Sequence, residues 1–255
     1  MPLTVLPLLS KRKKGRFDLF EELLETLEKN EFTFQEGDVL VISTKYISNS
    51  QGRIVDTNNI KVSKRGLKIS KMFQLKPEIA EIILRETDQI FGGIAGFVIT
   101  SSDNIMAPNG GIDKSNAKKD KVILYPKNPF LIAEQIRRKI FLRDFVHVGV
   151  ILVDSRLMPG RMGTSGVAIS CAGIEPVLDM RSKKDLDGNP LKVTFQAVCD
   201  NIATIANHKM GEGAESKPFA IVRDSGAQLT GRKINSKEMA ISPDQCVYVR
   251  GLRGE

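Results

Sequence analysis

The sequence predicts a mixed α/β (α+β) fold in which helices flank mixed β-sheets. Two stretches, residues 17–29 and 130–143, carry apolar residues at helical spacing and polar residues on the opposite face. Two uninterrupted apolar runs of strand length, residues 39–43 and 148–153, have the pattern of strands buried on both faces. Helices and buried strands that alternate in this way are typical of an enzyme-like α/β or α+β domain.

Further elements follow the same rules. Residues 75–88 have helical spacing, and Pro77 falls in the first turn, where a missing N–H is tolerated. Residues 94–100 and the segment after Pro218 are predicted strands, and a helix is expected from about residue 195 to 207. Neither an internal repeat nor a clear linker divides the 255 residues. The prediction is therefore one domain over residues 1–255, or two subdomains that are closely joined.

The chain carries a formal net charge of +8, and its one dense cluster of positive residues spans residues 11–16. Such a charge suits nucleic acid, an anionic membrane surface or an anionic small molecule as a partner. The chain has no Trp, three Tyr and no nucleic-acid-reading motif, so nucleic acid is the less favoured partner. A solvated loop ahead of the first helix is the simpler interpretation of the cluster.

No feature of the sequence indicates a membrane-bound or secreted protein. No apolar run approaches the roughly 18 residues of a spanning helix, and the first residues lack the cleavage site of a signal peptide. A cytoplasmic location is expected. The three cysteines are far apart and form no C-x-x-C pair, which favours reduced thiols. The two histidines are isolated, which disfavours a histidine triad or a histidine metal cage.

Three segments set an acidic residue beside glycines or at the end of an apolar strand: NGGIDKSN (109–116), LVDSR (152–156) and MGEGAES (210–216). Glycines let backbone N–H groups approach phosphate oxygens closely. Carboxylate and hydroxyl oxygens are the ligands that magnesium and manganese prefer. Asp113, Asp154 and Glu212 would together form a metal site beneath a nucleotide's phosphates. The alternative is that each is an ordinary turn residue.

The order and wording of these segments resemble one enzyme family. STKYISNSQGRI, NGGIDKSN, VDS…PGRMG…VAIS, DMR…D.DGNPL and MGEGAE…P stand in the order seen in the gamma-glutamyl ligases of coenzyme F420 biosynthesis, across roughly residues 36–223. Each piece is short, but five pieces in order are hard to obtain by accident.

The resemblance implies an enzyme that adds L-glutamate to the lactate-linked carboxylate of a deazaflavin precursor, F420-0, and consumes GTP. It also implies Mg²⁺ or Mn²⁺, a monovalent cation as a further candidate, and a homodimer. By motif, the metal ligands would be Asp113, Asp154, Ser155 and Glu212, the catalytic residues Asp113, Asp154 and Arg161, and the nucleotide contacts Ser43, Thr44, Asn49, Asn116, Met210, Gly211, Gly213 and Glu215.

The sequence also departs from the family pattern. In the family's Ser-Lys-x-Glu-Gly segment, Asn49 replaces the lysine and Gln51 replaces the glutamate, and further along Leu157 and Met158 replace a Gly-Arg pair. Losing a cation that faces phosphate removes a charge-assisted contact of roughly 1.5–3 kcal/mol. Lys45 or the basic cluster could compensate. Two alternatives therefore stay open beside the named ligase: a paralogue that uses another acidic acceptor or another nucleotide, and a non-catalytic protein that binds an anion or nucleic acid.

Overall fold

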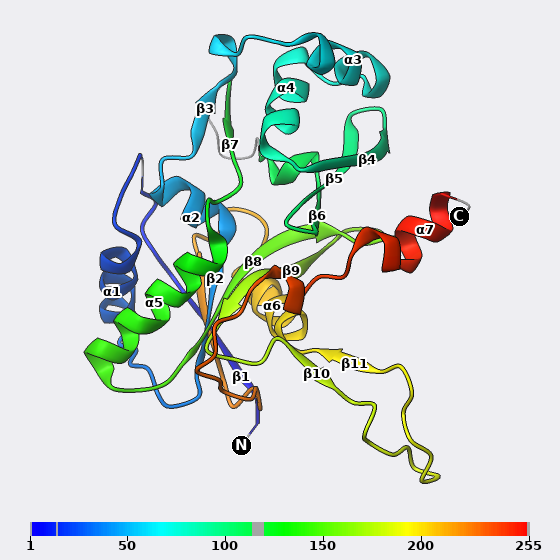
Figure 1. Cartoon of the computed structure of the whole chain (residues 1–255). Coiled ribbons are helices and arrows are strands. Elements are labelled where there is room, and N and C mark those ends of the chain that lie inside the picture. The colour runs from blue at the N-terminus through cyan, green and yellow to red at the C-terminus, as the bar shows by residue number, and fades with distance from the viewer. Residues whose placement is uncertain (1, 14, 114–119, 254–255) are drawn as a thin grey trace.

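A five-stranded mixed sheet forms the centre of the computed structural model, which describes residues 2–13, 15–113 and 120–253 (Figure 1). The strand order is β1 (Thr4–Leu8), β12 (Phe219–Arg223), β2 (Val39–Ser43), β8 (Gly149–Leu157) and β9 (Thr164–Ala172). Only β2 and β8 run parallel; the other neighbours pair antiparallel. The predicted mixed α/β class is confirmed.

Helices cover both faces of this sheet (Figure 1). On one face, α1 (Leu19–Lys29) and α5 (Pro129–Asp144) pack against Leu40, Ile42, Val150 and Leu152. On the other face, α6 (Val198–Met210) packs against the alternate residues of the same strands, such as Val41 and Ile151. Because β2 is buried on both faces, it reads as a continuous apolar run rather than as an alternating one.

A smaller unit with its own apolar core stands at one end of the sheet (top of Figure 1). It contains α3 (Lys64–Phe73), α4 (Pro77–Glu86) and the antiparallel sheet of β4 (Gln89–Ile94), β5 (Phe97–Ser102) and β6 (Ile105–Pro108). The chain enters and leaves it through the paired strands β3 (Ile54–Asp56) and β7 (Lys121–Ile123). We call this the outer unit.

The remaining elements are short. Helix α2 (Thr44–Ser50) directly follows β2, and strands β10 (Val177–Asp179) and β11 (Phe195–Ala197) form an arm that projects from the body (Figure 1). Helix α7 (Val247–Arg253) lies near the C-terminus. Single turns of 3₁₀ helix occupy Thr57–Asn59, Asn109–Gly111, Ser236–Glu238 and Pro243–Gln245.

Several predicted elements occur with changed limits. The strand expected at 94–100 spans a turn between β4 and β5, since Gly96 has a φ of +83° that glycine adopts without strain. The helix expected from residue 195 begins at Val198, because residues 195–197 pair with β10 instead. The strand expected to end at Asp154 continues to Leu157, paired with β9.

The three cysteines are free thiols, and Cys171 and Cys199 are buried. Across the part of the chain that the structure describes, every helix is too short or too polar to cross a membrane.

A β-bulge in β9 is held by a carboxylate from α6. The β8–β9 register steps from Leu152–Ser170 to Val153–Ala168, which leaves Ile169 as the extra residue of β9. The Asp200 side chain accepts a hydrogen bond of 2.9 Å from the Ala168 N–H at this step. Burial raises the pKa of the Asp200 carboxyl, although the Ala168 bond and nearby Arg156 oppose the shift. The charged form of Asp200 therefore costs stability in the folded protein.

We expect Asp200→Asn to be at least as stable as the parent protein at pH 7, since the amide oxygen can still accept the Ala168 bond without a buried charge. Because folding raises the pKa of Asp200, the loss of stability that its charge causes in the parent protein grows as the pH rises through that raised pKa. The loss vanishes below the ordinary carboxyl pKa of about 4. Asp200→Ala should instead lose about 1–3 kcal/mol, since the Ala168 N–H is left unpaired. Urea unfolding of the three proteins between pH 4 and 8 tests this. A loss of unfolding free energy in Asp200→Asn as large as that in Asp200→Ala would contradict this expectation.

Candidate active site

Two of the predicted acidic residues, Asp113 and Asp154, line the same small pocket although they are 41 positions apart in the chain. The pocket has a volume of about 20 Å³, enough for a water-sized occupant. It lies where α2 and β8 meet the segment that returns from the outer unit. Its other lining residues are Thr44, Lys45, Ser48, Gly111, Ile123, Leu124, Tyr125 and Pro126. We call it the acidic pocket.

The parallel register of β2 and β8 places Thr44 beside Asp154. Ser43, the last residue of β2, pairs with Val153 of β8. The residues that follow these two, Thr44 and Asp154, therefore lie at the carboxyl end of the parallel pair, where side chains emerge from the core. The Thr44 hydroxyl donates a hydrogen bond of 3.0 Å to one oxygen of Asp154.

Asp113 reaches the pocket after a turn that requires glycine. Gly110 and Gly111 have φ angles of +66° and +67°, and a Cβ on Gly111 would lie 2.8 Å from the Tyr125 ring. Asp113 then forms a two-way backbone bridge with Ile123, with N–O distances of 2.9 and 2.8 Å. Its carboxylate lies 2.6 Å from the Lys45 ammonium. Asn116, predicted to contact nucleotide, lies outside the described residues.

Arg156 is a further site residue that was not among the predicted ones. Its Nε lies 3.0 Å from the second oxygen of Asp154, and its Nη1 donates to the backbone oxygen of Met106 in β6. Its guanidinium lies 5.6 Å from the centre of the Tyr125 ring, and the side chain is only 5% exposed. In the sequence, its position two residues after Asp154 in a strand was the available signal, because alternate residues share a face.

Two polar atoms of this cluster are buried and have no hydrogen-bond partner within the described residues: the Arg156 Nη2 and the Tyr125 hydroxyl. Burial raises the pKa of Tyr125, so the phenol stays protonated at neutral pH and can donate. Unsatisfied buried donors of this kind are uncommon in folded proteins and are often found where a water or ligand binds.

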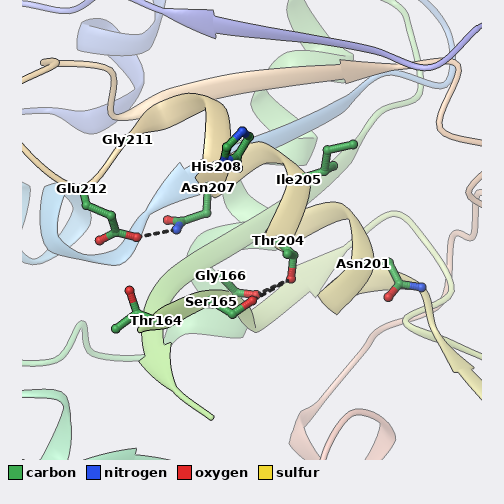
Figure 2. A pocket seen from close by; sticks show the side chains of 10 residues that line it. All are labelled: Thr164, Ser165, Gly166, Asn201, Thr204, Ile205, Asn207, His208, Gly211 and Glu212. Atoms are coloured by element: carbon green, nitrogen blue, oxygen red, sulfur yellow. Dashed lines mark hydrogen bonds between the residues drawn. The ribbon is translucent and has the colours of Figure 1, made fainter. Parts of the chain in front are cut away.

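Glu212 lies on the other face of β8. Its Oε1 accepts hydrogen bonds of 2.7 Å from the Ser155 hydroxyl and 2.7 Å from the Asn207 side chain, the latter drawn in Figure 2. Successive residues of a strand point to opposite faces, which separates the Ser155–Glu212 pair from Asp154. Over residues 2–13, 15–113 and 120–253, no three His, Cys, Asp or Glu side chains gather as metal ligands. The predicted three-carboxylate cluster is thus not assembled in this structure.

The acidic pocket nevertheless offers oxygen donors of the kind that a divalent cation prefers: two carboxylates and the Thr44 hydroxyl. Here Lys45 and Arg156 balance the two carboxylates. A divalent cation bound between Asp113 and Asp154 would take over that balancing role and would leave Lys45 able to meet an anion. Asp113, Asp154 and Thr44 therefore fit a cation, while Ser155 and Glu212 lie on the opposite face of β8.

The predicted nucleotide contacts fall into two groups. Ser43, Thr44 and Asn49 lie at the start and within α2. Gly211, Gly213 and Glu215 form a compact loop in which the Glu215 carboxylate accepts the Gly213 N–H at 2.7 Å. Met210, the last residue of α6, is buried in the core between this helix and the sheet. Its side chain therefore supports the loop and does not line it. Arg161 lies between β8 and β9 with an exposed side chain.

Gln51 has a local structural role. Its side chain donates to the backbone oxygen of Lys127 at 3.1 Å and accepts from the Lys127 N–H at 2.9 Å. An amide can make both bonds at once, whereas an ionised glutamate can only accept. The replacement of the family's glutamate by Gln51 is therefore matched to this contact.

Comparison with known proteins identifies the class of enzyme that carries this sheet and this acidic pocket as a ligase. The family model for F420-0:Gamma-glutamyl ligase matches residues 12–224. The chain is 37% identical to the coenzyme F420:L-glutamate ligase of Methanocaldococcus jannaschii, over 80% of this chain and 82% of that protein. Proteins of the same name from Methanopyrus kandleri and Archaeoglobus fulgidus are each 32% identical, over 91% and 90% of this chain and 91% of each relative. The chain belongs to the F420-0:gamma-glutamyl ligase family.

We expect Arg156→Met to lower the free energy of unfolding by about 2–4 kcal/mol, because removing one partner of a largely buried pair leaves the other charge uncompensated. Combining it with Asp154→Asn should recover part of the loss, since the double variant holds no unpaired charge. Urea unfolding of the single and double variants gives the coupling. Purely additive losses would show that the two side chains do not depend on each other.

Proposed function

We propose that this chain is a GTP- and divalent-metal-dependent ligase that joins L-glutamate to coenzyme F420-0 through an amide bond. Family membership supports the ligase chemistry, and the names of the relatives supply the substrates. The observation that carries the proposal is the meeting of Asp113 and Asp154 in one pocket beside Thr44. These residues come from separate segments of the chain, and the β2–β8 pairing and the Asp113–Ile123 bridge bring them together.

The proposed course has two steps. The acceptor carboxylate attacks the terminal phosphorus of GTP and displaces GDP, and the resulting acyl phosphate is attacked by the glutamate amine with loss of phosphate. A divalent cation, when bound, neutralises phosphate charge during the transfer. Asp113 and Asp154 would hold it, whereas Ser155 and Glu212, the other two predicted ligands, bind each other on the opposite face of β8. Thr44 and Arg156 fix the Asp154 carboxylate, which keeps the ligand geometry rigid before substrate binds.

Lys45 is the proposed replacement for the cation lost at Asn49. It belongs to the same short helix, lines the acidic pocket and lies 2.6 Å from Asp113. With a divalent cation on the carboxylates, the Lys45 ammonium can turn to a phosphate oxygen. The Gly211–Glu215 loop, Ser43 and Asn116 would contact the rest of the nucleotide. A monovalent cation, a homodimer and a cytoplasmic location, expected from the resemblance and the composition, belong to the same proposal.

A paralogous amide ligase is the second candidate. Asn49 stands where the family has its phosphate-facing lysine, and Met158 stands where it has an arginine. These departures favour another acidic acceptor or another nucleotide with the same two-step chemistry. Nucleic-acid binding has less support, because Lys13 of the basic cluster pairs with Glu22 and Glu25 of α1 instead of projecting freely.

The decisive assay combines the full chain, GTP, Mn²⁺ or Mg²⁺, L-glutamate and F420-0, and measures glutamylated product by mass spectrometry together with GDP. We expect both products in equal amounts, and a loss of both when the metal is chelated. Asp154→Asn should lower kcat by 100-fold or more, roughly the cost of a lost metal ligand and its charge. Asp144→Asn, at the end of α5, is the matched control and should retain activity.

Metal and nucleotide binding without glutamylation of F420-0 would favour the paralogue, and the same assay with other acidic acceptors and with ATP would then identify its reaction. A wild-type chain that turns over no nucleotide under any of these conditions would refute both ligase proposals.

A further inference from the structure

A second and larger hollow lies between the start of β9 and the exposed side of α6 (Figure 2). Its volume is about 710 Å³, within the range of roughly 300–1,000 Å³ that small-molecule sites occupy. It is lined by Thr164, Ser165, Gly166, Asn201, Thr204, Ile205, Asn207, His208, Gly211 and Glu212. We call it the α6–β9 groove.

The floor of the groove depends on Gly166. A Cβ on this residue would lie 2.5 Å from the Asn207 Cβ and 2.7 Å from the Ala203 backbone oxygen, so any side chain would push α6 away from β9. The Thr204 hydroxyl donates to the Gly166 backbone oxygen at 2.8 Å and holds the helix at this short distance. The close packing of α6 on β9 at Gly166 therefore determines the shape of the groove floor.

The lining is almost free of charge. More than a quarter of the chain's residues are charged, yet among the described residues that line the groove Glu212 is the one Asp, Glu, Lys or Arg. The other polar groups are hydroxyls, amides and the His208 imidazole, and Ile205 adds an apolar surface. A triphosphate needs cations, so the phosphates of the nucleotide do not match the part of the groove lined by Asn201, Thr204 and Ile205. Neutral donors and acceptors around an apolar patch match a ring system with carbonyl, N–H and hydroxyl groups.

One end of the groove lies close in sequence and structure to the acidic pocket. Glu212 in the groove binds Ser155, and Ser155 directly follows Asp154 of the acidic pocket. The pairing of β2 with β8 ends at Val153, so β2 does not cover the backbone edge at Asp154 and Ser155. A tail that leaves the groove past Ser155 can therefore pass around this edge from the α6 face of β8 to the face that carries Asp154.

We infer that the α6–β9 groove binds the uncharged ring and hydroxyl groups of the acceptor and directs its carboxylate tail past Ser155 to the acidic pocket. This inference rests on the proposed function, since it names the place of that reaction's acceptor. It assigns specificity for the acceptor to Asn201, Thr204 and Ile205, which lie away from the Gly211–Glu215 loop proposed to contact the nucleotide.

The test compares Ile205→Lys, which places a charge in the neutral groove, with Leu142→Lys, which adds the same charge to an exposed apolar position of α5. Steady-state kinetics of the full chain should show that Ile205→Lys raises KM for F420-0 by about tenfold, equal to about 1.4 kcal/mol of binding free energy. Its kcat and its KM for GTP should stay within about twofold of wild type, and Leu142→Lys should match wild type throughout. Asn201→Leu, a milder change, should raise the same KM in a folded protein.

The outcomes separate the two proposals. An active wild type whose KM for F420-0 is unchanged in both groove variants overturns the groove and leaves the ligase intact. A wild type without turnover refutes the ligase, and equilibrium dialysis of F420-0 then decides the groove: weaker binding to Ile205→Lys than to Leu142→Lys supports it, and equal or absent binding overturns it. Sedimentation velocity adds a further criterion, because an oligomer that dissociates only in Ile205→Lys would mark the groove as a contact between two copies of the chain and overturn the inference.

Discussion

The parallel pairing of β2 with β8 is the constraint on which the acidic pocket depends. This pairing fixes Ser43 opposite Val153. The residues that follow them, Thr44 and Asp154, are both polar groups of the site. A shift of one residue would turn Asp154 to the opposite face and separate it from the Thr44 hydroxyl. The surrounding strands are buried on both faces and hold this register through packing, so the core of the protein sets the geometry of the acidic pocket.

The sequence revealed the parts of the fold in which a single periodicity dominates. The buried run 39–43 and the amphipathic segment 17–29 occur close to their expected limits. Strand β9 was missed because it mixes polar, small and apolar residues without a regular period in a glycine-rich stretch, and its bulge depends on Asp200, 32 positions further along in a helix. Helix α3 was missed because Lys and Arg occupy so many of its positions that its apolar face is narrow.

For the candidate site too, the sequence showed local features but not the contacts between distant segments. Asp113 and Asp154 could be identified because glycine-rich turns and strand ends are local features of sequence. Their meeting could not be deduced from spacing, since it depends on the Asp113–Ile123 bridge beyond the outer unit. Arg156 escaped notice because an arginine in a strand is usually exposed, and only the tertiary structure shows it buried beside Tyr125. Glu212 was predicted to share one metal site with Asp113 and Asp154; in the structure it binds Ser155 on the face of β8 away from those two carboxylates.

The bond from Arg156 to the Met106 backbone oxygen has a consequence for motion. The outer unit has its own apolar core and joins the sheet mainly through β3 and β7, an arrangement that commonly permits local opening at lower cost than global unfolding. Here such an opening would strip the guanidinium of an acceptor and loosen the carboxylate that it holds. Opening of the outer unit would therefore weaken the acidic pocket, and exchange of β6 amide protons with solvent should accompany loss of the Arg156–Met106 bond.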